Sequence, residues 1–123
     1  MTETALISIV DDEESIREAI ESLLRSVGFR TQTFASAEQF LQSDQIETTA
    51  CLILDVRMPG MSGLELQRQL MATQYRIPIV FVTAHGDAEA RSRALQEGAV
   101  EFLLKPFSEE ALLNAIQVAL PAH

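Results

Sequence analysis

Short β-prone segments alternate along the whole chain with stretches in which apolar residues recur at helical spacing. Apolar or β-branched runs of four or five residues are typical of strands, so they predict strands at 6–10, 30–34, 51–54, 79–82 and 100–104. The stretches that follow these runs predict five helices. In the first helix the apolar stripe consists of Ile16, Ile20, Leu23, Leu24 and Val27.

Three serines mark expected helix starts. Ser36 with Gln39, and Ser62 with Glu65, have the spacing of a capping box, and Ser108 precedes two glutamates. Buried positions then recur after each start. We expect them at Phe40, Leu41, Leu66, Leu70 and Met71, at alanines and Leu95 of a fourth helix over 87–96, and at Leu112, Leu113, Ile116 and Leu120.

This alternation of strands and helices indicates the α/β class, with a parallel sheet covered by helices on both faces. The apolar strands belong in the middle of the sheet, whereas the polar strand over 30–34 suits an edge. A flavodoxin-like, doubly wound (βα)5 sheet of strand order 2-1-3-4-5 meets these conditions. No linker or repeat interrupts residues 1–123, so we expect one domain and no output domain within them.

Polar residues follow the central strands at the points where those strands end. Asp11 and Asp12 follow the first strand, Asp55 the third, Thr83 the fourth and Lys105 the fifth. The carboxyl ends of parallel strands lie along one edge of a sheet, and ligands of doubly wound folds bind outside that edge. We therefore expect these side chains to converge.

Three neighbouring carboxylates raise one another's pKa. Either one of them is therefore protonated, or a cation lies among them. An all-oxygen set of ligands favours a hard ion, and Mg²⁺ typically binds one or two carboxylates together with phosphate oxygens. Lys105 would add a fixed positive charge, which suits phosphoryl transfer. Asp55, central in the predicted group, is the candidate nucleophile, because a carboxylate can form an aspartyl phosphate.

Each of these residues also has a purely structural interpretation. Asp11 or Asp12 alone could cap the first helix, and Asp55 could begin an Asx-turn. Thr83 could be an ordinary β-branched strand residue, and Lys105 a solvated loop lysine. Their shared position after four strands favours a binding site.

The net charge of −9 and the lack of a Lys/Arg cluster argue against nucleic-acid binding by this domain. No apolar run approaches the roughly 18 residues of a membrane span, so we expect no membrane insertion. The single cysteine, Cys51, cannot form an internal disulfide and reads as a small buried hydrophobe. A cytoplasmic location is the resulting expectation.

The chain resembles the receiver domains of two-component response regulators over residues 6–120. The resemblance is carried by Asp11-Asp12, Asp55, Thr83 and Lys105-Pro106, and by the longer segments around them, DVRMPGMSGLEL, FVTAHGD and FLLKPF. These segments are similar to the FixJ-type subgroup of regulators. The resemblance implies a phosphorylation switch rather than an enzyme.

The resemblance also implies roles for single residues. Asp55 would accept the phosphoryl group, and Asp12, Asp55 and the backbone carbonyl of Arg57 would bind Mg²⁺, with Asp11 assisting through water. Lys105 and Thr83 would contact the phosphoryl oxygens, and the Lys105-Pro106 bond would be cis.

Three further positions are assigned by the resemblance. Phe102 matches an aromatic switch residue, although an aromatic in a last strand is more often core. Arg57 and His85 match positions that tune the access of water to the phosphoryl group, and both could instead be ordinary surface residues.

The implied partner is a sensor histidine kinase, with homodimerisation on phosphorylation. Relatives of this subgroup carry a DNA-binding domain, so the chain would be a stand-alone receiver or part of a longer transcription regulator. One alternative is a Mg²⁺-dependent aspartyl-phosphate phosphohydrolase, although Arg57 lies where that class has a general acid. A flavin- or nucleotide-binding module would need phosphate-cradling residues where Asp11-Asp12 lie.

Overall fold

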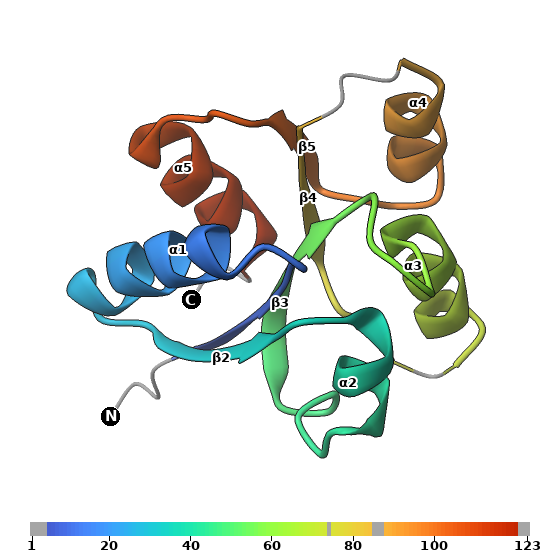
Figure 1. The fold of residues 1–123 in the computed structure, drawn as a ribbon, viewed down its shortest axis with the longest axis horizontal. Coiled ribbons are helices and arrows are strands. Elements are labelled where there is room, and N and C mark those ends of the chain that lie inside the picture. The colour runs from blue at the N-terminus through green and yellow to red at the C-terminus, as the bar shows by residue number, and fades with distance from the viewer. Residues whose placement is uncertain (1–4, 74, 85–87, 121–123) are drawn as a thin grey trace.

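A single five-stranded parallel sheet with helices on both faces forms the molecule (Figure 1). This computed structural model describes residues 5–73, 75–84 and 88–120. The elements alternate in the order β1 (Leu6–Val10), α1 (Glu14–Ser26), β2 (Arg30–Phe34), α2 (Ala37–Gln42), β3 (Thr49–Asp55), α3 (Gly63–Met71), β4 (Ile79–Thr83), α4 (Ala88–Gln96), β5 (Glu101–Leu104) and α5 (Glu109–Ala119).

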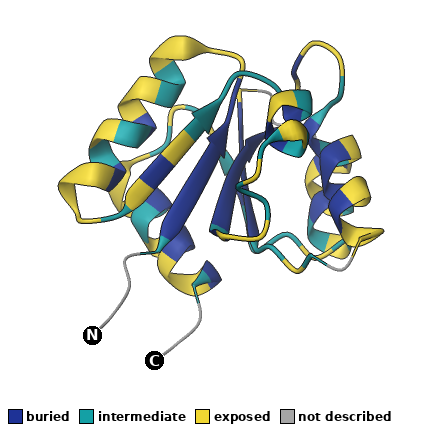
Figure 2. Ribbon diagram, turned by 90° about the horizontal axis from the view of Figure 1, so that it is seen from below, coloured by how far each residue is buried: buried dark blue, intermediate teal, exposed yellow. Residues whose placement is uncertain are grey.

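The strand order is β2-β1-β3-β4-β5, which confirms the predicted α/β, flavodoxin-like topology. All four neighbouring pairs are parallel, and β3 lies in the centre between β1 and β4. The three inner strands are almost entirely buried, whereas the edge strand β2 alternates between exposed and covered positions (Figure 2). The apolar content of each strand therefore decides its place in the sheet.

Each face of the sheet has its own hydrophobic core. On one face α1 and α5 cover side chains of β1, β3 and β4, with Leu24 and Ile116 fully buried. On the other face α2, α3 and α4 cover the alternate side chains, with Phe40 and Phe81 fully buried. This division follows from the strand period of two, which sends successive side chains to opposite faces.

Three predicted core residues belong to neither core cluster, and one of them, Leu95 of α4, is half-buried. Met71 is 54% exposed and Val27 is 49% exposed. Met71 follows the buried Leu70 by one residue, and a step of about 100° along a helix takes it off the buried stripe. Val27 is the C-cap of α1, beyond the last helical turn.

The predicted serine caps are present at the starts of α2, α3 and α5. Each serine hydroxyl accepts a hydrogen bond from the backbone N–H three residues later. At α3 the capping box is complete, because Glu65 also accepts from the N–H of Ser62 at 2.9 Å. At α2, Gln39 instead accepts from the N–H of Ala35, one residue before the cap.

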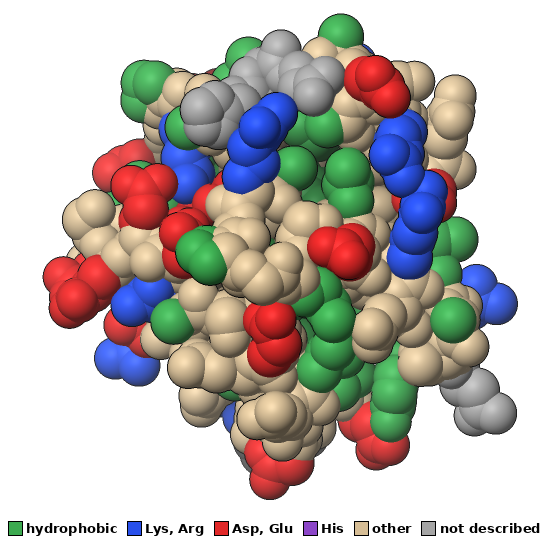
Figure 3. All heavy atoms as spheres, turned by 45° about the vertical axis from the view of Figure 1, so that its right-hand side comes forward, with side chains coloured by type: hydrophobic (Ala, Val, Ile, Leu, Met, Phe, Trp, Pro, Cys, Tyr) green, Lys and Arg blue, Asp and Glu red, His purple; other side chains and the backbone are tan. Residues whose placement is uncertain are grey.

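Acidic and basic side chains are interspersed on the face shown in Figure 3, with hydrophobic side chains in the hollows between them. The net charge of −9 is thus not gathered into one patch on this face. Among the described residues, no helix is both long enough and apolar enough to cross a bilayer.

The start of α3 lies directly against the end of β3. The N–H of Gly63 donates to the carbonyl of Val56 at 2.9 Å. A Cβ on Gly63 would lie 2.1 Å from the backbone oxygen of Asp55, so only glycine allows this approach. The packing of α3 against the end of β3 fixes the short loop between them.

Gly63→Ala is expected to lower the free energy of unfolding by about 2–4 kcal/mol, because the methyl group meets backbone that cannot move aside. Urea denaturation measures the change. Gly98→Ala is the control: its Cβ would meet nothing within 4 Å, but its φ of +102° is left-handed, so we expect a cost of only about 1–2 kcal/mol. Equal costs for the two variants would contradict the close approach.

Candidate functional site

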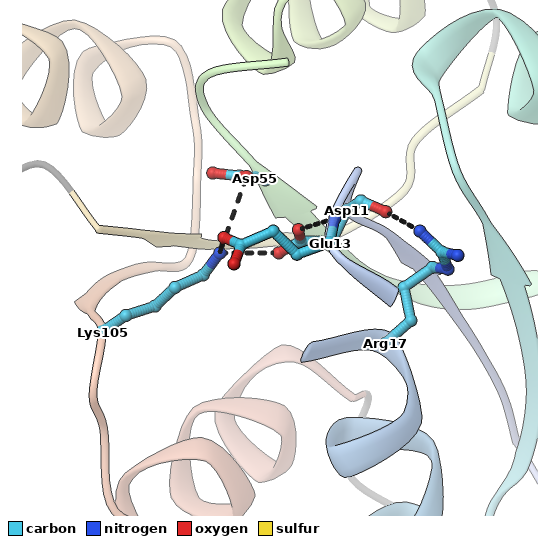
Figure 4. Close-up of polar contacts among 5 residues, drawn as sticks. All are labelled: Asp11, Glu13, Arg17, Asp55 and Lys105. Atoms are coloured by element: carbon cyan, nitrogen blue, oxygen red, sulfur yellow. Dashed lines mark hydrogen bonds and ion pairs between the residues drawn. The ribbon is translucent and has the colours of Figure 1, made fainter. Parts of the chain in front are cut away.

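The polar residues that follow the central strands converge at the carboxyl edge of the sheet (Figure 4). Asp11 follows β1, Asp55 is the last residue of β3, Thr83 is the last residue of β4, and Lys105 follows β5. Asp11 and Lys105, which are 94 residues apart in the sequence, are in direct contact. Convergence follows from the parallel topology, since all four strands point the same way.

Three carboxylates form the acidic part of the site. Asp11, Asp12 and Asp55 each place one oxygen so that all three oxygens lie within 4.8 Å of one another. Asp11 is fully buried and Asp55 is 4% exposed, whereas Asp12 faces solvent. This all-oxygen set, with one member open to solvent, fits a small hard cation such as Mg²⁺ that retains part of its water shell.

Lys105 lies opposite the carboxylates as a nearly buried counter-charge. Its Nζ is 2.8 Å from Oδ2 of Asp11, 3.4 Å from Oε1 of Glu13 and 3.6 Å from Oδ2 of Asp55. The ammonium group thus bridges two of the clustered aspartates (Figure 4). A cleft of about 230 Å³ opens beside it, lined by Asp12, Glu13, Asp55, Arg57, Ala84 and Lys105.

The surroundings of the Asp55 carboxyl group disfavour its ionised form. Its pKa is raised to about 6, first by burial and then by the negative charge of Asp11, while Lys105 and the N–H of Arg57 partly oppose the rise. For Lys105, burial alone would lower the pKa, but the hydrogen bond to Asp11 and the charge of Asp55 outweigh burial and raise it. Asp55 is therefore the member of the cluster that a cation would stabilise most clearly.

Asp11 has both a structural contact, at the start of α1, and a contact within the acidic site. Its Oδ1 accepts from the N–H of Glu13 at 2.9 Å, just ahead of α1, while its Oδ2 contacts Lys105. The N-cap of α1 is Glu13, whose side chain makes no capping bond, so neither Asp11 nor Asp12 is the cap residue itself. Asp11 thus orders the loop that carries Asp12.

Two residues at the site are not evident from sequence. Glu13 contacts Lys105, and Arg17 of α1 donates to the carbonyl of Asp11 at 2.7 Å. Neither residue directly follows a strand, which is the position from which the other site residues were predicted. Arg17 could be noticed only as a basic residue one turn into the helix that follows the acidic pair.

The remaining predicted positions lie nearby. Thr83 is 1% exposed, and its carbonyl accepts from the N–H of Lys105 at 2.7 Å. Phe102 is 6% exposed and packs against Phe81, with ring centroids 6.0 Å apart. Arg57 is exposed at the cleft.

Three further predictions concern the bond after Lys105 and two other positions, Cys51 and His85. The Lys105-Pro106 bond is cis, as the resemblance implied. Cys51 is buried, and burial raises the pKa of its thiol to about 12, which agrees with an inert core residue. The prediction for His85 lies outside the described residues.

The sequence matches a known protein family along most of its length. Residues 7–117 match the response regulator receiver domain, and the chain belongs to this family. The receiver fold and the FixJ-type resemblance are thus confirmed. Receiver domains of this family act as phosphorylation switches of two-component signalling systems.

The chain is also similar to the receiver-containing part of individual response regulators. It is 48% identical over 116 residues to the response regulator protein TodT of Pseudomonas putida, covering 94% of this chain and 51% of TodT. It is 38% identical over 120 residues to the transcriptional regulatory protein FixJ of Bradyrhizobium diazoefficiens, covering 98% of this chain and 58% of FixJ. The solved structure of the response regulator StyR superposes with a TM-score of 0.89 at 52% identity, covering 96% of this chain and 60% of StyR. The chain therefore spans about half the length of the curated relatives it matches.

Asp55→Asn is expected to stabilise the protein at neutral pH in the absence of divalent cations. Because the folded-state pKa of Asp55 is raised to about 6, the folded protein binds this proton more tightly than the unfolded chain does. That contribution to stability is complete below about pH 4 and is lost as the pH rises through about 6. Removing the charge should therefore raise the free energy of unfolding at pH 7 by about 1–3 kcal/mol, measured by urea denaturation.

The same comparison at pH 4, or at pH 7 with millimolar Mg²⁺, provides the control. The gain should shrink in both conditions, because a proton or a cation already relieves the repulsion. A lower stability of the variant at pH 7 without Mg²⁺ would show that Asp55 is not destabilised by its neighbours.

Proposed function

We propose that Asp55 accepts a phosphoryl group with Mg²⁺ bound beside it, and that this modification switches the domain. One observation supports this proposal above all: three carboxylates lie together at the sheet edge with the Lys105 ammonium group against them. If Lys105 were only a solvated loop lysine and Asp11 only a helix cap, their side chains would not lie buried against each other. The family to which the chain belongs acts through this kind of chemistry.

Asp12, Asp55 and the backbone carbonyl of Arg57 would hold the cation, with Asp11 acting through water. The donor set is all oxygen, the cleft is open at Asp12 and Arg57, and the crowded carboxylates need a compensating positive charge. The ion supplies charge neutralisation for a transferring phosphoryl group. By offsetting burial and the charge of Asp11, a bound ion would also lower the pKa of Asp55 from its raised value of about 6.

In the transfer step, a carboxylate oxygen of Asp55 attacks the phosphorus atom of the donor. For a phosphohistidine donor, the new P–O bond forms as the P–N bond breaks, and the electron pair returns to the imidazole nitrogen, which then takes a proton from water. Lys105, already 3.6 Å from Asp55 Oδ2, would contact a phosphoryl oxygen while keeping its bond to Asp11.

The new charge would act on the neighbouring strand ends. The Thr83 side chain would donate to a phosphoryl oxygen, and Phe102 would respond as the aromatic switch residue. The helix that follows Thr83, α4, is anchored by few large side chains, with Ala90 and Ala94 as its buried residues. Such an element moves at low cost in lost packing, so it is a plausible carrier of the signal. Arg57 and His85 would tune the lifetime of the phosphoryl group.

A sensor histidine kinase in the cytoplasm would be the donor, and the phosphorylated domain would form a homodimer. The relatives TodT and FixJ are regulators about twice as long as this chain, so we propose that it serves as the receiver part of a transcription regulator. DNA binding would then belong to an output domain rather than to this acidic receiver. The domain would be a switch rather than an enzyme, because Arg57 stands where a phosphohydrolase has its general acid.

Incubation with Mg²⁺ and acetyl phosphate should add the mass of one phosphoryl group to the protein, observed by intact-mass spectrometry. Asp55→Asn should remain unmodified, because it lacks the nucleophile, whereas Asp44→Asn, at an exposed loop position, should react like the wild type. Chelation of Mg²⁺ should abolish the reaction. An unmodified wild type, or equal modification of the Asp55 variant, would overturn the proposal.

A further inference from the structure

The loop between β3 and α3 carries the backbone carbonyl of Arg57, which the proposed Mg²⁺ site requires. Its ends are well fixed. Asp55 ends the buried strand β3, and the N–H of Gly63 donates to the carbonyl of Val56. Met58 is 8% exposed and anchors the loop in the core below. The outer turn, Gly60 and Met61, lies between these anchors.

A carboxylate from another element contacts this outer turn. Glu38, in the first turn of α2, accepts a hydrogen bond through its Oε2 from the N–H of Met61 at 2.9 Å, across 23 residues of sequence. The bond from Met61, followed by one from Glu38's own N–H, lowers the pKa of the Glu38 carboxyl. The contact therefore joins an ionised side chain to the backbone of the loop.

Gly60 shows how closely the carboxylate lies over the loop. A Cβ on Gly60 would lie 2.5 Å from Oε2 of Glu38, and the φ of Gly60 is +77°. Both observations require glycine at this position while Glu38 holds its place. The carboxylate thus occupies the space above the turn and accepts its next N–H, which stabilises the observed conformation of the turn.

We propose that Glu38 is a positioning residue for the cation site: its reach to Met61 holds the β3–α3 loop so that the Arg57 carbonyl is placed for Mg²⁺. This inference rests on the proposed function, since it assumes that the carbonyl is a ligand. Groups that orient metal ligands without touching the ion commonly change metal affinity. Glu38 would do so through the backbone rather than through a ligand side chain.

Two substitutions separate reach from charge. Glu38→Asp keeps the negative charge but is one methylene too short to contact Met61, whereas Glu38→Gln keeps the length and an acceptor oxygen without the charge. Gln39→Ala is the matched control, because Gln39 lies at the same helix start and its side chain accepts from the N–H of Ala35 rather than from that of Met61. Mg²⁺ affinity is measured by calorimetric titration of each purified protein.

If Glu38 positions the loop, Glu38→Asp should raise the Mg²⁺ dissociation constant about threefold to tenfold, below the full effect of a direct outer-shell partner. Glu38→Gln should stay within about twofold of wild type, as should Gln39→Ala. Phosphorylation of Glu38→Asp by acetyl phosphate should need more Mg²⁺ but reach the wild-type maximal rate. A merely structural role would instead lower stability without changing the Mg²⁺ requirement.

Unchanged Mg²⁺ affinity in Glu38→Asp, or a larger loss in Glu38→Gln than in Glu38→Asp, would overturn the inference. The amide signal of Met61 in a ¹H–¹⁵N spectrum checks the contact directly and should shift in Glu38→Asp far more than in Gln39→Ala. Failure of the proposed function is distinguishable, because it would appear as a wild-type protein that neither binds Mg²⁺ nor takes up a phosphoryl group.

Discussion

The site depends on one electrostatic constraint: carboxylates gathered at the end of a parallel sheet repel one another. Burial makes the repulsion stronger, because it removes the solvent that would screen it, and the raised pKa of Asp55 is its direct consequence. Lys105 compensates part of this charge through its contacts with Asp11 and Asp55. The compensation is incomplete, which leaves the cluster ready for a further cation and then for the oxygens of a phosphoryl group.

In this fold the strands bring the polar residues together, and separate contacts fix the loops that follow the strands. Central strands bring Asp11, Asp55 and Thr83 to one edge, and the core holds them there, because each strand is buried on both faces. The loops beyond the strands are fixed individually: Asp11 accepts from Glu13, the Gly63 N–H binds the end of β3, and Glu38 of α2 reaches the next loop. Rigid strands and tied loops thus position a polar site that would be unstable on flexible segments.

Sequence reasoning succeeded where one strong physical rule applies and failed where a contact depends on tertiary geometry. The apolar runs predicted the strands and their order, and the residues after them predicted the acidic cluster and Lys105, because parallel topology leaves few alternatives. The contacts of Glu13 with Lys105 and of Glu38 with the β3–α3 loop were not predicted. Both residues lie at helix starts, and their contacts depend on how the long side chains are oriented in the folded protein. Met71, Leu95 and Val27 were wrongly assigned to the core, because an apolar pattern shows neither how wide the buried stripe of a helix is nor where the helix ends.

In the proposed site, Asp12, Asp55 and the Arg57 carbonyl would surround a hard divalent cation at this edge of the sheet. Crystals grown with Mn²⁺, which takes similar oxygen ligands, test it directly through anomalous diffraction. We expect a single strong peak between the carboxylates of Asp12 and Asp55, within coordination distance of the Arg57 oxygen and on the side away from Lys105. A peak elsewhere, or none at this position with Mn²⁺ in excess, would contradict it.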